Sequence, residues 1–478
     1  MATKFALMIA LTLAGVGCRS TLHLQDEIAT RMLAADYSGA LQIVEGNRRG
    51  AYGGKNRLLY YFEKGMLLHL DGRFVESNVA FERAKRIGDE LYTRSVSEIG
   101  FSMFTNDNVQ AYAGENFERT LLHLFAALNY ASLGERDSAL VEVRQVGDYL
   151  RKLQVDSTNE NSYQDDAFAR YLSALLYEVG GEYDSALVDF KKAAQLYGGR
   201  YAFDYSVAQP ASLLPDAHRV ARRLGAWAEN DLREIDPNGF ARILPAGAGE
   251  VVILHYNGLF PIKSQDRFTI PFIEAWPYVL ALQAVADADV RAQIAAGTAV
   301  SGIWSGIDVI SVVFPRFVDR PYSIATMAAR SRAAFEVTPA ELVEDIGAIA
   351  EKDLADRIVR IRAKAIARAA LKYAVQKAIE QALGQALGQA DDEYRVALQH
   401  LTQIGGGLAR FASEQADKRI WSTLPDQIWM SYVVLPEGSH DIEIDFMNVA
   451  QNVVESRVIP GVQVTPGSRR FVIVRTVQ

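Results

Sequence analysis

The chain contains GMLLHLDGRFVESNVAFERA at residues 65–84, and the same pattern recurs as ALLYEVGGEYDSALVDFKKA at residues 174–193. Both copies place a small residue, a glycine seven positions later and an aromatic residue two positions after that glycine. This spacing is typical of a helical hairpin, in which small residues let two helices approach closely and the glycine ends the first helix. A middle copy has Ala127, Gly134 and Ala139 in the corresponding places.

The spacing resembles the tetratricopeptide repeat, a helical hairpin that stacks into a curved array. A looser copy, with Tyr37, Ala40 and Val44 in the equivalent places, is expected before the others. In repeats of this kind the second, fifth and ninth residues of each first helix line the concave groove. Here all of these residues are apolar or aromatic, namely Leu59, Phe62, Met66, Leu121, Leu124, Leu128, Phe168, Tyr171 and Leu175.

An empty groove of this composition would expose on the order of several hundred Å² of apolar surface, more than a soluble monomer tolerates. We therefore expect a helix to fill it. Two candidates lie in the same chain, the segment after Tyr205 and the apolar stripe from Leu371 to Leu387. The third candidate is an amphipathic helix of a partner protein.

Composition predicts a multidomain protein and excludes several functions. A chain of 478 residues with 49% hydrophobic content can bury more than one core. The net charge of −8 and the lack of a Lys/Arg block argue against a nucleic-acid partner. The seven histidines show no metal-binding spacing, and no nucleophile elbow or phosphate loop occurs. We therefore expect no metal, no cofactor, no catalytic residues and no enzymatic activity.

The first residues form a secretory leader that ends at the only cysteine of the chain. Lys4 precedes an apolar run that is too short to span a bilayer, and AGVGC, residues 14–18, follows. These five residues resemble the bacterial lipobox, which implies a lipoprotein signal peptide over residues 1–17 and lipidation of Cys18. The alternative is an ordinary leader with an incidental cysteine. Arg19 implies anchoring in the outer membrane of a Gram-negative cell, with the protein facing the periplasm.

One stretch between the first two complete hairpins departs from the repeat pattern. It contains Tyr112-Ala-Gly-Glu115-Asn-Phe117-Glu118-Arg119 and leads into Asn129-Tyr130. These residues resemble an uncharacterised family of bacterial envelope lipoproteins with tetratricopeptide-like repeats. The resemblance implies non-catalytic work in the cell envelope, with small lipoproteins or activators of penicillin-binding proteins as partners.

The same stretch is our candidate binding site. We expect Tyr112 to Arg119 to form a fixed loop against the middle hairpin, close to Asn129 or Tyr130, since long ordered loops are often functional. A structural plug is the alternative. Glu115 and Glu118 could also act as the two carboxylates of a glycan-cleaving enzyme. We favour a binding function over this enzymatic one.

Shifts in composition set the domain boundaries. Residues 18–205 form the array, and the proline-containing residues 206–238 are expected to be a linker. A mixed domain over residues 239–425 follows. Within it VVILHYNGLFPI, residues 251–262, predicts a β-hairpin that turns at Asn-Gly, and the run from Ile307 to Phe317 is expected to pair with this hairpin.

The mixed domain also contains a long apolar segment and the start signal of a long helix. Residues 294–314 are long enough to cross a bilayer, but their glycines and serines favour a loop followed by a buried strand. The capping box Thr338-Pro-Ala-Glu predicts the start of a helix that runs to about Gly388, with a break near Gly347 or Arg362.

The last part, residues 426–478, has four short alternating runs, which predict a small antiparallel β-sandwich. LPEGSHDIEI, residues 435–444, resembles the PEGA-type envelope module. The fold class predicted is therefore multidomain, with an α-helical array, a mixed α/β domain and a β-rich part. The function predicted is a lipid-anchored scaffold that binds envelope proteins through its array. The alternative is a lipoprotein that binds or processes glycans through residues 112–119.

Overall fold

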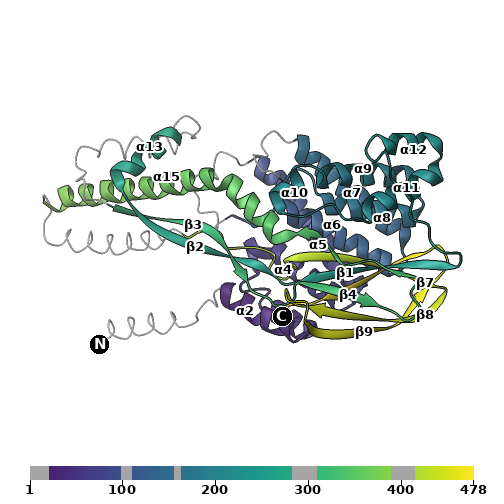
Figure 1. Cartoon of the computed structure of the whole chain (residues 1–478). Helices are drawn as coiled ribbons and strands as arrows, with labels where there is room; N and C mark the ends of the chain where they lie inside the picture. Colours follow the sequence, from purple (N-terminus) through teal and green to yellow (C-terminus); the bar gives the residue numbers. More distant parts are fainter. Residues whose placement is uncertain (1–20, 98–109, 156–162, 283–308, 389–414) are drawn as a thin grey trace.

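The computed structural model describes residues 21–97, 110–155, 163–282, 309–388 and 415–478, and its N-terminal half consists of successive helical hairpins (Figure 1). The pairs are α2 (Thr21–Leu33) with α3 (Tyr37–Gly46), α4 (Arg57–Leu70) with α5 (Phe74–Ser97), α6 (Asn116–Ser132) with α7 (Arg136–Val155), and α8 (Ala167–Gly180) with α9 (Tyr183–Tyr197). The expected helix pairs are confirmed, including the looser first copy. Cys18 lies outside the described residues.

The repeat residues act locally as their spacing predicts. Gly72, Gly134 and Gly181 follow the first helix of each complete pair with φ near +80°, a conformation that only glycine adopts freely. At Gly65 a side chain would meet the ring of Phe81 at 2.3 Å. The two helices of this hairpin can therefore pack closely only because the position is a glycine.

The expected linker is wrong, because most of residues 206–238 is helical. After α10 (Arg200–Tyr205) come α11 (Leu213–Leu224), which packs against α9, and α12 (Ala226–Arg233). Pro215 stands in the first turn of α11, where the missing N–H costs nothing. Pro210 and Pro215 thus mark the start of α11, and Pro237 follows the end of α12.

Two sheets form a sandwich that covers one side of the helices (Figure 1), and a third sheet of two strands lies apart from it. The larger sheet has the order β10 (Arg469–Arg475), β1 (Ala248–Asn257), β7 (Gln427–Pro436) and β5 (Glu336–Val337), and β6 (Glu341–Asp345) also pairs with β7. The smaller sheet consists of β4 (Thr326–Arg330), β8 (Gly438–Met447) and β9 (Val453–Val464). β1 pairs parallel to β10 and antiparallel to β7.

β1 is buried on both faces, which gives the molecule three layers. Val252, Leu254 and Tyr256 join the core of the helical array. Val251 and Ile253 point the other way and join the core of the sandwich with the smaller sheet. This alternation follows from the period of two in a strand. The helices, the larger sheet and the smaller sheet therefore lie on top of one another.

The four C-terminal strands are present where the alternation predicts them, but their arrangement differs from the expected antiparallel sandwich. β7 and β10 lie on either side of β1, and β8 pairs with β4, so both sheets mix strands from residues 239–425 and 426–478. A boundary at residue 425 would divide each sheet. The β1–β10 pairing is parallel, which requires a long connection between the two strands, and more than two hundred residues separate them.

The predicted Asn-Gly hairpin is wrong. Both edges of β1 are taken by β7 and β10, so β2 (Leu259–Pro271) cannot fold back onto it and pairs with β3 (Val309–Arg320) instead. The run from Ile307 to Phe317 was expected to pair with the hairpin, and its described part, in β3, pairs with β2 and not with β1. Gly258 has a φ of +68° and redirects the chain. Most of residues 294–314 lies outside the described residues, and the buried strand expected at its end is β3.

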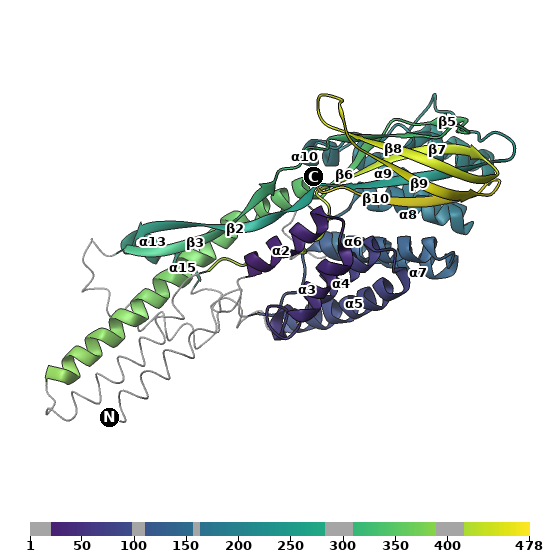
Figure 2. The same ribbon diagram turned by 90° about the horizontal axis from the view of Figure 1, so that it is seen from below.

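β2, β3, α13 (Phe272–Leu282) and α15 (Ile346–Gly388) form an arm that projects from the body (Figures 1 and 2). The predicted helix start is wrong, because the Thr338 hydroxyl accepts the Tyr432 N–H and Glu341 lies in β6. Asp345 caps α15 instead by accepting the Ala348 N–H. The helix is continuous through Gly347 and Arg362, so neither predicted break occurs. Leu371 packs with α13, within the arm.

Within the described residues the concave groove is filled by the chain itself, mainly by strands and a loop and not by a single helix lying along it. All nine predicted groove residues are buried. Trp421 stacks on Phe62 with ring centroids 4.4 Å apart, and Tyr432 of β7 meets Tyr171 with 2.7 Å between the hydroxyl oxygens. The occupants are thus the array-facing side of the larger sheet and the segment around Trp421. The expected helical occupant is wrong because strands of alternating character offer an apolar face as well as helices do.

Candidate binding sites

The stretch from Tyr112 to Arg119 lies at the start of α6, with Tyr112, Phe117 and Glu118 buried and the other residues partly exposed. Glu115 is the N-cap of this helix, and its backbone N–H donates to Glu118 Oε2 at 2.8 Å. The Tyr112 hydroxyl donates to the same oxygen at 2.6 Å. Phe117 contacts the ring of Phe260, 5.9 Å away between centroids. The stretch therefore matches the structural plug, and a glycan has no access to the fully buried Glu118.

Glu118 and Glu63 hold the segment that fills the groove. The Trp421 N–H donates to Glu118 Oε1 at 2.7 Å. The Ser422 and Thr423 N–H groups donate to the two oxygens of Glu63 at 3.0 and 3.1 Å. Burial and the nearby Glu115 raise the pKa of Glu118 to about 7, and burial raises the pKa of Glu63. Two array carboxylates thus replace the strand partners that this loop lacks.

Glu115 connects the arm to the array. Its oxygens receive Lys263 Nζ of β2 at 2.5 Å and Arg357 Nη2 of α15 at 2.9 Å. Burial alone would raise the pKa of Glu115, but Arg357 and Lys263 outweigh it and lower that pKa. Glu115 is therefore a charged anchor, and Glu118 a carboxyl that accepts three hydrogen bonds. Neither faces open space as a catalytic acid or base requires.

The structure does not bring Asn129 and Tyr130 to this stretch. Eleven residues of α6 separate Glu118 from Asn129, which is about 16 Å along a helix. Asn129 is buried among His69, Ser77 and Asn78, and the His69 Nδ1 lies 2.6 Å from its side-chain oxygen. Tyr130 is half-buried near the end of α6. The expectation that these residues form one site is wrong.

An arginine-lined cavity lies where α8 and α11 meet the larger sheet. We call it the arginine pocket; its volume is about 660 Å³. Its charged and tyrosine lining consists of Arg136, Glu178, Tyr183, Arg219, Arg222, Arg223, Arg242, Glu250 and Arg469. Six arginines thus face two carboxylates, in a chain whose net charge is −8.

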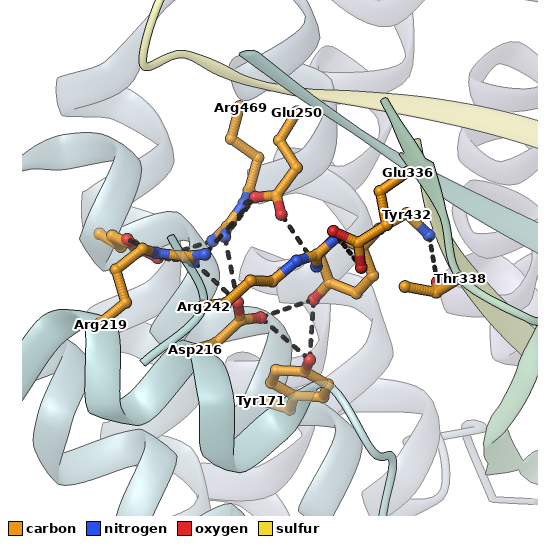
Figure 3. Close-up of polar contacts among 10 residues, drawn as sticks. Tyr171, Asp216, Arg219, Arg242, Glu250, Glu336, Thr338, Tyr432 and Arg469 are labelled. Atoms are coloured by element: carbon orange, nitrogen blue, oxygen red, sulfur yellow. Dashed lines mark hydrogen bonds and ion pairs between the residues drawn. The ribbon is translucent and has the colours of Figure 1, made fainter. Parts of the chain in front are cut away.

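A network of ion pairs forms the base of this pocket (Figure 3). Arg219 Nε lies 2.8 Å from Glu178, and Arg469 lies 2.7 Å from Glu178 and 2.6 Å from Glu250. Behind them Asp216 accepts the Tyr432 hydroxyl at 2.9 Å. Burial raises the pKa of Asp216. Burial would raise that of Glu178 too, but Arg469 and Arg219 lower it to about 2.

Arg242 is the one arginine of this base whose guanidinium makes no hydrogen bond in the described structure. Its side chain is 8% exposed and lies over the Tyr432 ring, 4.7 Å from the centroid. Nη1 approaches Glu250 at 3.0 Å and Nη2 approaches Glu336 at 3.5 Å, but no nitrogen meets hydrogen-bond geometry. Arg219 Nη1 is also buried without such a bond. Glu250 Oε1 is likewise left without a hydrogen bond, so Arg242 is held in place by ion pairs with Glu250 and Glu336 that do not have hydrogen-bond geometry.

The outer part of the pocket carries further positive charge. Arg223 donates to the Tyr183 hydroxyl at 2.9 Å. Arg136 and Arg222 are exposed, and their side chains have no ion pair or hydrogen bond in the described part of the chain. Arginine guanidinium groups bind carboxylates and phosphates with paired hydrogen bonds. The arrangement can therefore hold an anion without any catalytic group.

Sequence reasoning missed this pocket because its arginines come from α7, α11, the loop before β1 and β10. The Arg222-Arg223 pair and the Arg469-Arg470 pair were the signals available. Among the described residues no cluster of His, Cys, Asp or Glu is arranged to bind a metal, and no helix there is long and apolar enough to cross a membrane. No family model matches the chain, and no curated protein is significantly similar to it.

Proposed function

We propose that this protein is a non-catalytic, lipid-anchored scaffold of the cell envelope that captures an acidic segment of another envelope protein in the arginine pocket. The observation that carries this proposal is the lining of the arginine pocket, where six arginines face two carboxylates and the exposed Arg136 and Arg222 have no ion pair among the described residues. The anchor and the location rest on the leader sequence around Cys18. Small lipoproteins and activators of penicillin-binding proteins are the partner classes implied by the resemblance.

The proposal moves the binding site away from the concave groove. The groove is occupied by Trp421 and by the larger sheet, so a partner has no place there. At the arginine pocket a partner carboxylate gains hydrogen bonds to charged donors, each worth about 1.5–3 kcal/mol. The low-dielectric walls also concentrate the positive potential and attract acidic chains from a distance.

The experiment is a binding titration of fluorescein-labelled octaglutamate with the full mature chain, followed by fluorescence anisotropy. Reversing the charge of two outer arginines, in the variant Arg136→Glu with Arg222→Glu, should weaken binding at least about tenfold, since about 1.4 kcal/mol suffices for that factor. These side chains are exposed, so the fold should not change.

The control is Arg151→Glu with Arg200→Glu. It changes the net charge equally at two side chains that are 71% and 76% exposed and lie outside the pocket. At the same salt concentration, the dissociation constant of this control for octaglutamate should lie within about twofold of that of the unmodified protein. Equal weakening in both double variants contradicts the proposal, because net charge alone would then explain binding.

A further inference from the structure

The edge strand of the larger sheet has unpaired backbone groups. β10 pairs with β1 alone, in parallel. The Glu250 N–H donates to Ser468 O at 2.9 Å, and the Thr476 N–H donates to Tyr256 O at 3.0 Å. In a parallel ladder these two bonds direct Arg470, Val472 and Val474 toward β1. Phe471 and Ile473 must then turn their N–H and C=O groups away, and within the described residues those groups have no partner.

This open edge lines a second cavity of about 760 Å³, which we call the edge groove. One wall consists of the loops that close the hairpins, with Phe74 and Leu133, and the other of β9, with Pro460 and Val462. A cavity of this size is in the range of ligand-binding clefts. β10 is seven residues long and spans about 23 Å. Arg457 donates to the outward C=O of Arg475, so the part of the edge that is open to a peptide centres on Phe471 and Ile473.

The charge of the edge groove selects the kind of peptide. Its lining includes Arg136, Arg457, Arg469, Arg470 and Arg475 and no Asp or Glu. Arg475 and Arg457 are engaged with protein groups, whereas Arg470 is exposed and has no ion pair among the described residues. Electrostatic complementarity therefore favours an acidic segment. A second copy of β10 is disfavoured, since it would place Arg469 and Arg470 beside further arginines.

The edge groove and the arginine pocket are continuous, because Arg136, Val179, Ser468 and Arg469 line both. We propose that an acidic, extended segment of the partner adds to the larger sheet as a strand beside β10, with a carboxylate at one end in the arginine pocket. This inference rests on the proposed function and specifies how the partner is held. Main-chain hydrogen bonds to Phe471 and Ile473 give affinity, and the arginines give specificity.

The test uses the full mature chain and the peptide acetyl-Glu-Val-Glu-Val-Glu-Val-Glu-amide. The probe for comparison is the same peptide with N-methylated backbone amides, which keeps the carboxylates and cannot donate to a strand. N-methylation should weaken binding at least tenfold. Ile473→Pro removes an outward N–H and leaves the β1 pairing intact, so it should also weaken binding of the unmethylated peptide tenfold.

Hydrogen exchange gives a readout that does not depend on the proline variant folding. Binding of the unmethylated peptide should slow exchange of the Phe471 and Ile473 amides at least tenfold. The Val472 amide, which already bonds to β1, should exchange slowly with and without peptide. Octaglutamate binding that depends on Arg136 and Arg222, combined with equal binding of both heptapeptides and no change at Phe471, overturns strand addition and leaves the proposed function standing. Absence of all anionic binding overturns both.

Discussion

Replacing Trp421 by Ala should destabilise the protein more than truncation of any other tryptophan among the described residues. The Trp421 side chain is fully buried in the groove of the array. Its ring stacks on Phe62 at 4.4 Å with an interplanar angle of 16°, and meets Phe81 and Phe125 edge-on at 6.0 and 5.9 Å. Its indole N–H donates to Thr423 Oγ1 at 3.0 Å.

The expected loss of unfolding free energy is about 3–5 kcal/mol, the range for truncation of a buried large aromatic side chain. The backbone N–H of residue 421 can still donate to Glu118, so the loss measures ring packing. Trp227→Ala is the matched control, because Trp227 is 58% exposed and its truncation should change stability by less than about 0.5 kcal/mol.

The assay is urea unfolding of both variants, followed by circular dichroism at 222 nm so that loss of tryptophan fluorescence does not interfere. The midpoint of Trp421→Ala should fall well below those of the unmodified protein and of Trp227→Ala, with the slope unchanged. If the two variants unfold at the same urea concentration, then Trp421 does not join the array to the sheet and our account of the filled groove is wrong.

Three other predictions follow from the same structure. Burial and Glu115 raise the folded pKa of Glu118 to about 7, so the protonated carboxyl is favoured in the fold, and raising the pH from about 4.5 to about 7 should cost about 3 kcal/mol of unfolding free energy. Thermal unfolding of Glu118→Gln should depend less on pH over this range, and an unchanged dependence of stability on pH would contradict the assignment. Tyr171→Glu should prevent stable folding, since its ring lies in the buried groove, and a soluble, fully folded variant by circular dichroism would count against self-occupancy. Cys18→Ala should leave the protein outside the outer-membrane fraction. Recovery of this variant in the outer membrane would contradict lipid anchoring through Cys18.

Local features were predictable from sequence because neighbouring residues determine them. The glycines at 72, 134 and 181 end helices through their own backbone freedom, and the alternation from Gln427 to Leu435 forms a strand in any sheet. The nine groove positions follow from the resemblance to the tetratricopeptide repeat, and all nine are buried. Spacings of three and four residues place the three positions of each helix on one face.

Partnerships between distant residues were not predictable. The Asn257-Gly258 turn has the local signal of a hairpin, but two strands from the C-terminal end already occupy both edges of β1. The Thr338 capping box failed in the same way, because its hydroxyl is used by β7. The burial of Glu118 reflects a contact with Trp421, 303 positions away. Tertiary contacts of this kind override local preference.

The arginine pocket shows the same limit for the candidate site. Arg242 and Arg469 are separated by more than two hundred residues and meet only because β10 pairs beside β1. Residues 112–119 attracted attention because they combine aromatic and charged groups. In the structure that combination serves to cap α6 and to fix the arm through Lys263 and Arg357.

Site-specific photocrosslinking in the native envelope tests capture at the arginine pocket, with p-benzoylphenylalanine in place of Ile243, which lines the pocket and is 71% exposed. Val141, 48% exposed on α7 and outside both cavities, is the control position. We predict a crosslink from position 243 to an acidic segment of one envelope protein, lost when Arg136→Glu and Arg222→Glu are added, and no crosslink from position 141. A crosslink from position 243 that persists in that double variant, or crosslinks from position 141 alone, would contradict capture of an acidic partner at the arginine pocket.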